Sequence, residues 1–303
     1  MTCVSVSPQK YLVFAGSPGF RRLSRFLVAA FMTLPMAGCG TFDSLDPTTW
    51  FAEKYSPKVV PDTPSALLYD QGLAGVQKHD YGDAAKKFTE LEKQDQYTQW
   101  QRKALLMEAF SQYKKGSYDD AIGTTQRYIT LYAKAPDLDY AYYIEAMSYY
   151  NEIPDISRDQ DRADKAAKVF AAIVQRFPKS EYADDARYKL NITRDQLAGR
   201  DMMVGRYYLE RRDYTGAINR FRDVLAKYQT TRHAEEALER LTEAYMALGI
   251  TSEAQTAAAV LGHNFPDSRW YKDAYALLKR GGLQPHEDPT SWISKTVHKL
   301  GVG

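Results

Sequence analysis

The sequence contains very little cysteine: Cys3 and Cys39 are the two cysteines in 303 residues. A disulfide framework needs several cysteines at suitable spacings, so none is expected. Metal-ligating histidine is also sparse, because the five histidines are scattered without the spacing of a ligand set. They are His79, His233, His263, His286 and His298. We therefore expect no disulfide-stabilised fold, no bound metal and no dissociable cofactor.

Sequence motifs that carry catalysis are missing as well. The chain has no HExxH, no GxSxG, no glycine-rich phosphate loop and no Cys–His pair that could supply a nucleophile and its base. Neighbouring carboxylates such as Asp184 and Asp185 fall where a helix start already accounts for acidic residues. We therefore do not expect an enzyme.

An excess of positive charge is absent once the N-terminus is set aside. The formal net charge is +2, but residues 1–38 hold four basic groups (Lys10, Arg21, Arg22 and Arg25) and no acidic group. Without them, 36 basic and 38 acidic side chains leave a net charge of −2. Nucleic-acid binding requires a concentrated basic face, so it loses its main support.

Residues 1–38 have the pattern of a secretion signal. The arginines at 21, 22 and 25 precede thirteen residues, 26–38, that are apolar or small apart from Thr33. A membrane-spanning helix needs about 20 apolar residues, so this stretch is too short to span and suits a signal-peptide core.

The segment ends in Met36-Ala37-Gly38-Cys39, which resembles the lipobox of bacterial lipoproteins. The resemblance implies that Cys39 is acylated and becomes the mature N-terminus, with covalent lipid as the only attached group. A non-lipidated signal with an incidental cysteine is the alternative. Residue 40 is glycine rather than aspartate, which in lipoprotein sorting favours the outer membrane. Residues 39–64, with four prolines, form the expected tether between the lipid and the folded body.

A repeated apolar pattern fills the rest of the chain. Tyr214, Ala217, Phe221 and Val224 lie on one face at helical spacing, after a polar break at residues 211–213. The same offsets recur four times, with substitutions. The other copies are Tyr81-Ala84-Phe88-Leu91, Tyr118-Ala121-Thr125-Tyr128, Ala163-Ala166-Phe170-Ile173 and Ala254-Ala258-Leu261. The pattern resembles the tetratricopeptide repeat and predicts an all-α solenoid of about five helix-turn-helix repeats. An ordinary helical bundle is the alternative.

The same pattern sets the expected domain boundaries. Repeats one to three occupy residues 65–179, repeats four and five occupy 180–280, and 281–303 form a tail. The stretch 180–212 has no proline and only two glycines, so it predicts one long helix or two nearly continuous ones. The tail carries a weak apolar pattern, which indicates a short helix against the body or against a partner.

Several local sequences narrow the resemblance to one family. They are Asp139-Tyr140-Ala141-Tyr142-Tyr143, the charged insertion at 158–162, the run at 206–211 and the pair Asn219-Arg220. Together with the lipobox, the tether and the repeats, they resemble the BamD family, the lipoprotein subunits of the outer-membrane β-barrel assembly machinery. The resemblance covers about residues 30–279. Gln96 departs from it, because the family often has proline just before the aromatic residue there.

This resemblance implies a non-catalytic scaffold and substrate receptor, anchored by lipid at the periplasmic face of the outer membrane. Its C-terminal repeats would bind the BamA-type β-barrel subunit beside other lipoproteins of the complex, through Arg220 with Asn219 and Arg206. Its N-terminal repeats would contact unfolded outer-membrane proteins. We name four aromatic residues as candidate client contacts: Tyr69, Tyr97, Trp100 and Tyr113. The alternative function is a periplasmic repeat lipoprotein that acts as an envelope or cell-wall adaptor or as a secretin pilot.

Overall fold

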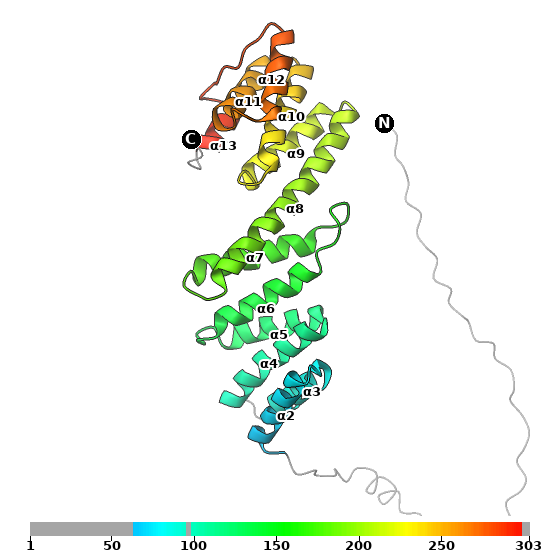
Figure 1. The fold of residues 1–303 in the computed structure, drawn as a ribbon, viewed down its shortest axis with the longest axis vertical. Coiled ribbons are helices and arrows are strands. Elements are labelled where there is room, and N and C mark those ends of the chain that lie inside the picture. Colours follow the sequence, from blue (N-terminus) through cyan, green and yellow to red (C-terminus); the bar gives the residue numbers. More distant parts are fainter. Residues whose placement is uncertain (1–62, 95–97, 299–303) are drawn as a thin grey trace, which may run out of the picture. The chain divides into compact units, whose positions relative to one another are not determined.

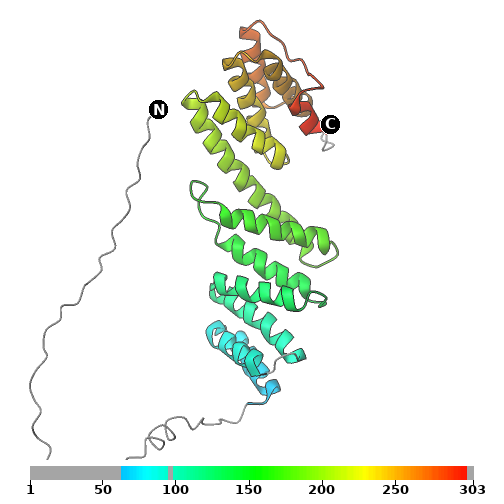
Figure 2. The ribbon, with the colours of Figure 1, turned by 180° about the vertical axis from the view of Figure 1, so that it is seen from behind.

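The computed structural model describes residues 63–94 and 98–298, and within these ranges the regular structure is entirely helical. From α2 to α12, each helix packs against the next one in the chain, while α13 packs against α11 and α9 (Figures 1 and 2). The helices are α2 (Ser65–Gln77), α3 (Tyr81–Gln94), α4 (Gln99–Lys115), α5 (Tyr118–Leu131), α6 (Leu138–Asn151), α7 (Asp161–Arg176), α8 (Ala183–Glu210), α9 (Tyr214–Lys227), α10 (His233–Ala247), α11 (Thr251–Asn264), α12 (Arg269–Arg280) and α13 (Trp292–His298). The predicted signal segment, Cys39, most of the tether and Tyr97 lie outside the described residues.

The helices from α2 to α11 form five antiparallel pairs, and the repeated apolar pattern lies on the second helix of each pair. The repeat alanines are fully buried, and so are the aromatic residues one turn later. They are Ala84, Ala121, Ala166, Ala217 and Ala254, with Phe88, Phe170 and Phe221. Thr125 replaces the aromatic residue on α5, and its Oγ1 donates to the carbonyls of Ala121 and Ile122, both at 2.9 Å. A buried hydroxyl is tolerated there because the helix backbone accepts its proton. The predicted all-α repeat fold is confirmed.

Four of the five turns within the pairs contain one residue in the left-handed region. Gly116 (φ 85°) and Gly249 (φ 74°) supply it in two pairs, while His79 (φ 59°) and Arg212 (φ 62°) supply it in two others. Residues with a Cβ adopt this conformation at a cost. The same backbone path is therefore used whether or not glycine is present. The pair α6/α7 differs, because residues 152–160 are inserted between its helices.

Close helix crossing depends on glycine in two of the pairs. A Cβ placed on Gly205 would lie 2.4 Å from Cε1 of Phe221, and a Cβ on Gly72 would lie 2.6 Å from Cε1 of Phe88. Both phenyl rings are fully buried. Each ring therefore occupies the space that a side chain on the first helix would need.

The long helix α8 takes part in two hydrophobic cores. Near its start, Ala186 and Leu190 pack with α6 and α7, and farther along Ala198 and Met202 pack with α9 and α10. It runs as one helix of 28 residues, as the absence of proline predicts. Figure 1 shows it passing from the green part of the stack to the yellow part. The elements around its C-terminal half position the candidate partner-binding residues.

The tail forms a short helix against the body. In α13, Ile293 is fully buried and Val297 is 8% exposed. Nε1 of Trp292 donates to the hydroxyl of Tyr245 at 3.0 Å. Of the two arrangements expected for the tail, packing against the body is therefore the one observed.

Candidate functional site

Arg220 is presented by α9 on the side that faces away from the repeat core. The helix begins after Asp213, whose Oδ1 accepts from the backbone amide of Gly216 at 2.9 Å. One residue of an α-helix rotates the side-chain direction by about 100°, so burial of Phe221 turns Arg220 outward. Its side chain is 43% exposed, and its Nη1 lies 3.6 Å from Oδ1 of Asp201 on α8.

A cavity of about 390 Å³ surrounds this ion pair, formed by α7, α8, α9 and the end of the 152–160 insertion. Five aspartates and three basic residues line it. They are Asp159, Asp161, Asp164, Asp201 and Asp223, with Arg200, Arg220 and Lys227. Nε of Arg200 is buried there and has no hydrogen-bond partner among the described residues. The cavity is therefore strongly polar and holds a donor that the fold itself does not satisfy.

The pairing of Arg220 with Asp201 is weak by geometry and by charge. A separation of 3.6 Å exceeds normal hydrogen-bond length. Burial raises the pKa of Asp201, and the negative charge of Asp223 raises it further. The guanidinium can therefore exchange this partner for a better-placed carboxylate, to which it could bind through two parallel N–H bonds.

Arg206 and Asn219 differ from Arg220 in their contacts and exposure. Nη1 of Arg206 donates to Oε1 of Glu236 on α10 at 3.0 Å, so this arginine belongs to a separate ion-pair network. Asn219 is exposed on α9 next to Arg220. The structure thus groups Arg220 with Asp201, a residue that the sequence did not single out, and engages Arg206 elsewhere.

Two of the candidate client contacts lie together, Tyr69 on α2 of the first repeat and Trp100 on α4 of the second. The rings of Tyr69 and Trp100 are 5.5 Å apart, and Tyr69 also packs against Phe88 at 5.7 Å. The ammonium of Lys103 lies 5.4 Å from the centre of the Trp100 ring. Tyr69 and Trp100 are partly buried. Each packs against the apolar core formed by α2, α3 and α4, and each also leaves part of its side chain exposed. Burial raises the pKa of Tyr69, with a further increase from Asp70, and the phenol is therefore neutral at physiological pH.

Tyr113 lies apart from that pair, on α4 beside the second turn. Its ring is 5.9 Å from Tyr118, and Nδ2 of Asn151 donates to both hydroxyls at 3.3 Å. The structure therefore divides the candidates between two places. Tyr97, the fourth, lies outside the described residues.

An apolar hollow that the sequence analysis did not anticipate lies between α5 and α6. It has a volume of about 470 Å³ and is lined by residues 131–136 and Arg102. Leu131 is 54% exposed at its edge. Arg102 is held by both carboxylate oxygens of Asp137, at 2.7 and 2.6 Å. Leu131 falls in the last turn of its helix, and an exposed leucine there was the one available signal.

No group of three or more His, Cys, Asp or Glu side chains is arranged to hold a metal ion within residues 63–94 and 98–298. Among the helices of the same ranges, none combines the length and the apolar character needed to cross a bilayer.

Comparison with known proteins gives a consistent result. The model of the YfiO family, described as outer membrane lipoprotein, matches residues 61–261. Outer membrane protein assembly factor BamD of Caulobacter vibrioides is 39% identical over 277 residues, which cover 91% of this chain and 86% of that protein. BamD of Rickettsia prowazekii is 40% identical over 216 residues, covering 71% of this chain and 86% of that protein. BamD of Neisseria meningitidis serogroup A is 29% identical over 263 residues, covering 84% of this chain and 96% of that protein. The family match includes α2 to α10 and most of α11.

Proposed function

The chain belongs to the YfiO family of outer membrane lipoproteins, and on this premise we propose that it is a non-catalytic assembly factor for outer-membrane proteins. The observation that carries the proposal is the match to the Caulobacter assembly factor at 39% identity along 91% of the chain. Its fold supports a binding role, because a stack of helical repeats offers extended surfaces along successive helices.

The first part of the proposal concerns the partner. A BamA-type β-barrel subunit binds at the C-terminal repeats, and Arg220 and Asn219 contact it. The half-exposed guanidinium, its loose contact with Asp201 and the unsatisfied Nε of Arg200 support this assignment. Arg206, which donates to Glu236 on α10, is the third partner contact in this proposal.

The second part concerns clients. Unfolded outer-membrane proteins contact the N-terminal repeats, where the Tyr69–Trp100 pair offers an aromatic surface with a cation beside it. Aromatic rings can receive alternate apolar side chains of an extended peptide. Tyr113 and Tyr97 are proposed as further contacts of the same kind.

The third part concerns the membrane. Cys39 carries covalent lipid and holds the chain at the periplasmic face of the outer membrane, beside the other lipoproteins of the complex. Confinement to a surface raises the effective concentration of partners, so contacts of modest affinity suffice.

A pull-down tests the partner assignment. The full-length lipidated chain would be purified in detergent from its own envelope, and the bound proteins identified by mass. The proposal predicts stoichiometric recovery of a large β-barrel protein with periplasmic repeat domains. Arg220→Glu is expected to reduce that recovery at least tenfold, because a charge-assisted pair becomes a repulsion. Lys179→Glu, which makes the same charge change at an exposed turn, is the matched control.

Two results would count against the proposal. Recovery of cell-wall or secretin components without a β-barrel partner would favour the adaptor function. Equal recovery with Arg220→Glu and the wild-type chain would remove Arg220 from the partner surface but leave the assembly role standing.

A further inference from the structure

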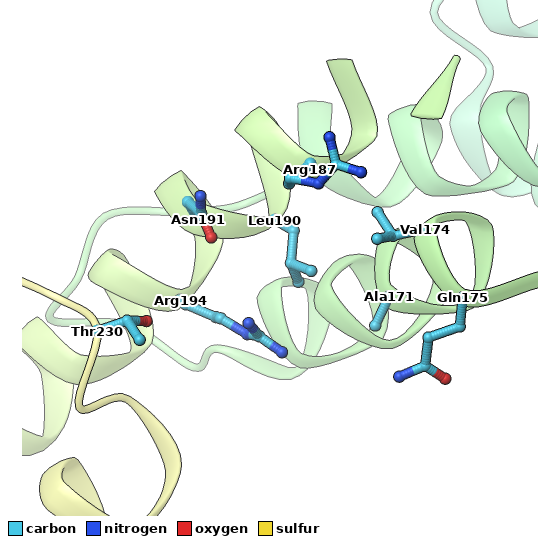
Figure 3. Close-up of a pocket in the computed structure, with 8 residues that line it drawn as sticks. All are labelled: Ala171, Val174, Gln175, Arg187, Leu190, Asn191, Arg194 and Thr230. Atoms are coloured by element: carbon cyan, nitrogen blue, oxygen red, sulfur yellow. The ribbon is translucent and has the colours of Figure 1, made fainter. Parts of the chain in front are cut away.

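A second cavity, of about 540 Å³, is lined by α7, by the first half of α8 and by Thr230 in the turn before α10. Figure 3 shows its lining side chains. None of them lines the cavity around Arg220. Its apolar part consists of Ala171 and Val174 from α7 and Leu190 from α8.

The polar part lies mainly on one row of α8. Arg187, Asn191 and Arg194 follow one another at intervals of four and three residues, which places them on the same helix face. The two guanidinium groups are thus about two helical turns apart, with an amide between them. Arg194 extends from α8 toward the α7 side in Figure 3.

The charge of this lining is one-sided. Two arginines and no carboxylate line the cavity, whereas five aspartates line the cavity around Arg220. Arg187 is paired at 2.6 Å with Asp184, but that carboxylate is 93% exposed and solvent weakens the pair. Arg194 is partly buried, and no carboxylate lies within ion-pair distance of it in the part of the chain that the structure describes. The lining of the cavity therefore has an excess of positive charge, and the cavity can accommodate a carboxylate from another molecule.

We propose that this cavity binds the acidic side chain of an aliphatic and acidic peptide segment in a partner protein. The carboxylate is received by Arg194 and Arg187, and the neighbouring aliphatic residues pack on Ala171, Val174 and Leu190. A free inorganic anion would leave this apolar part unused, which favours a peptide. Tyr188 and Ile192, which are 66% and 38% exposed and four residues apart on α8, extend the apolar surface beside the arginine row. The site is separate from Arg220 and does not rest on the proposed function.

Labelled peptides test the inference with the full-length, detergent-solubilised chain, read out by fluorescence anisotropy. The probe is an acetylated and amidated peptide centred on Leu-Glu-Leu, and its partner has Leu-Gln-Leu. A third peptide has Leu-Gln-Leu with a free C-terminal carboxylate. We expect saturable binding of the glutamate peptide, and at least tenfold weaker binding of the other two. Equal binding of all three, tighter binding of the free carboxylate, or no saturable binding at millimolar peptide would overturn the proposal.

Variants locate the binding within the molecule. Arg194→Gln removes the unpaired charge, and Asn191→Asp places a carboxylate of equal size between the two arginines. Each is expected to weaken binding of the glutamate peptide at least tenfold. Lys179→Gln, an equal loss of charge at a nearby exposed turn outside the cavity, is expected to change it less than twofold. Unchanged binding in both cavity variants would refute the site. If Arg194→Gln melts early by circular dichroism, Asn191→Asp decides alone, because Asn191 is exposed.

Discussion

Replacing Gly205 by alanine tests whether the helix crossing in the fourth repeat requires glycine. The added Cβ would lie 2.4 Å from Cε1, 2.8 Å from Cζ and 2.9 Å from Cδ1 of Phe221. Real Cβ atoms do not approach ring carbons so closely, so either the ring or the helix must move. The ring is fully buried, and its movement would disturb the C-terminal core.

The magnitude follows from two opposing effects. Overpacking of a well-packed core costs about 1–3 kcal/mol, while alanine gains about 1 kcal/mol over glycine in a helix interior. Gly123→Ala on α5 is the matched control, because a Cβ there meets nothing within 4 Å and the residue is exposed. That control is expected to raise the free energy of unfolding by about 0.5–1 kcal/mol. Gly205→Ala should therefore be less stable than Gly123→Ala by about 1–3 kcal/mol.

The assay is urea unfolding followed by circular dichroism at fixed temperature. Phe221→Leu shortens the obstructing side chain, so Gly205→Ala should be better tolerated in that background, which a double-mutant cycle would report as favourable coupling. If Gly205→Ala stabilises the chain as much as Gly123→Ala does, or if the cycle shows no coupling, the close-crossing argument is wrong.

Three further changes test other parts of the structure. Burial raises the pKa of Glu239 to about 7 despite the adjacent Arg240, so its ionisation destabilises the fold as pH rises from about 4.5 toward 7. Glu239→Gln should therefore increase the free energy of unfolding by roughly 1–3 kcal/mol at about pH 8 and change it little at about pH 5. Equal shifts in urea unfolding at the two pH values would contradict this. Ile293→Ala, at a fully buried position of α13, should cost about 2–5 kcal/mol and open the tail to proteolysis; an unchanged cleavage pattern would argue against docking of α13. Cys39→Ala should leave the circular dichroism unchanged and release the chain from salt-washed membranes; its retention there would argue against lipidation.

The repeat fold could be predicted because its signal is local and recurs. Small and large apolar residues at helical offsets mark the second helix of each repeat, and the alanines of that pattern are all fully buried. Even the polar exception, Thr125, fits once its hydroxyl is seen to donate to backbone carbonyls one turn earlier. Local spacing determines which face of a helix is buried, so a prediction made from that spacing holds in the structure.

The details of the sites could not be predicted, because they depend on which side chains meet across helices. Arg220 meets Asp201 and Arg206 meets Glu236, and neither partner is related to its arginine by a recognisable spacing. The left-handed residues His79 and Arg212 were also missed, since their side chains give no sign of that conformation. The cavity lined by Arg187 and Arg194 arises from the packing of α7 on α8, which no single segment encodes.

The most direct test of the assembly role is depletion of this chain in its own cells, followed by quantification of the envelope proteins by mass spectrometry. The account predicts that β-barrel proteins fall in the outer membrane while inner-membrane proteins and soluble periplasmic proteins keep their levels. Expression of the intact chain should restore the β-barrel proteins. Unchanged levels of β-barrel proteins after full depletion would contradict the account.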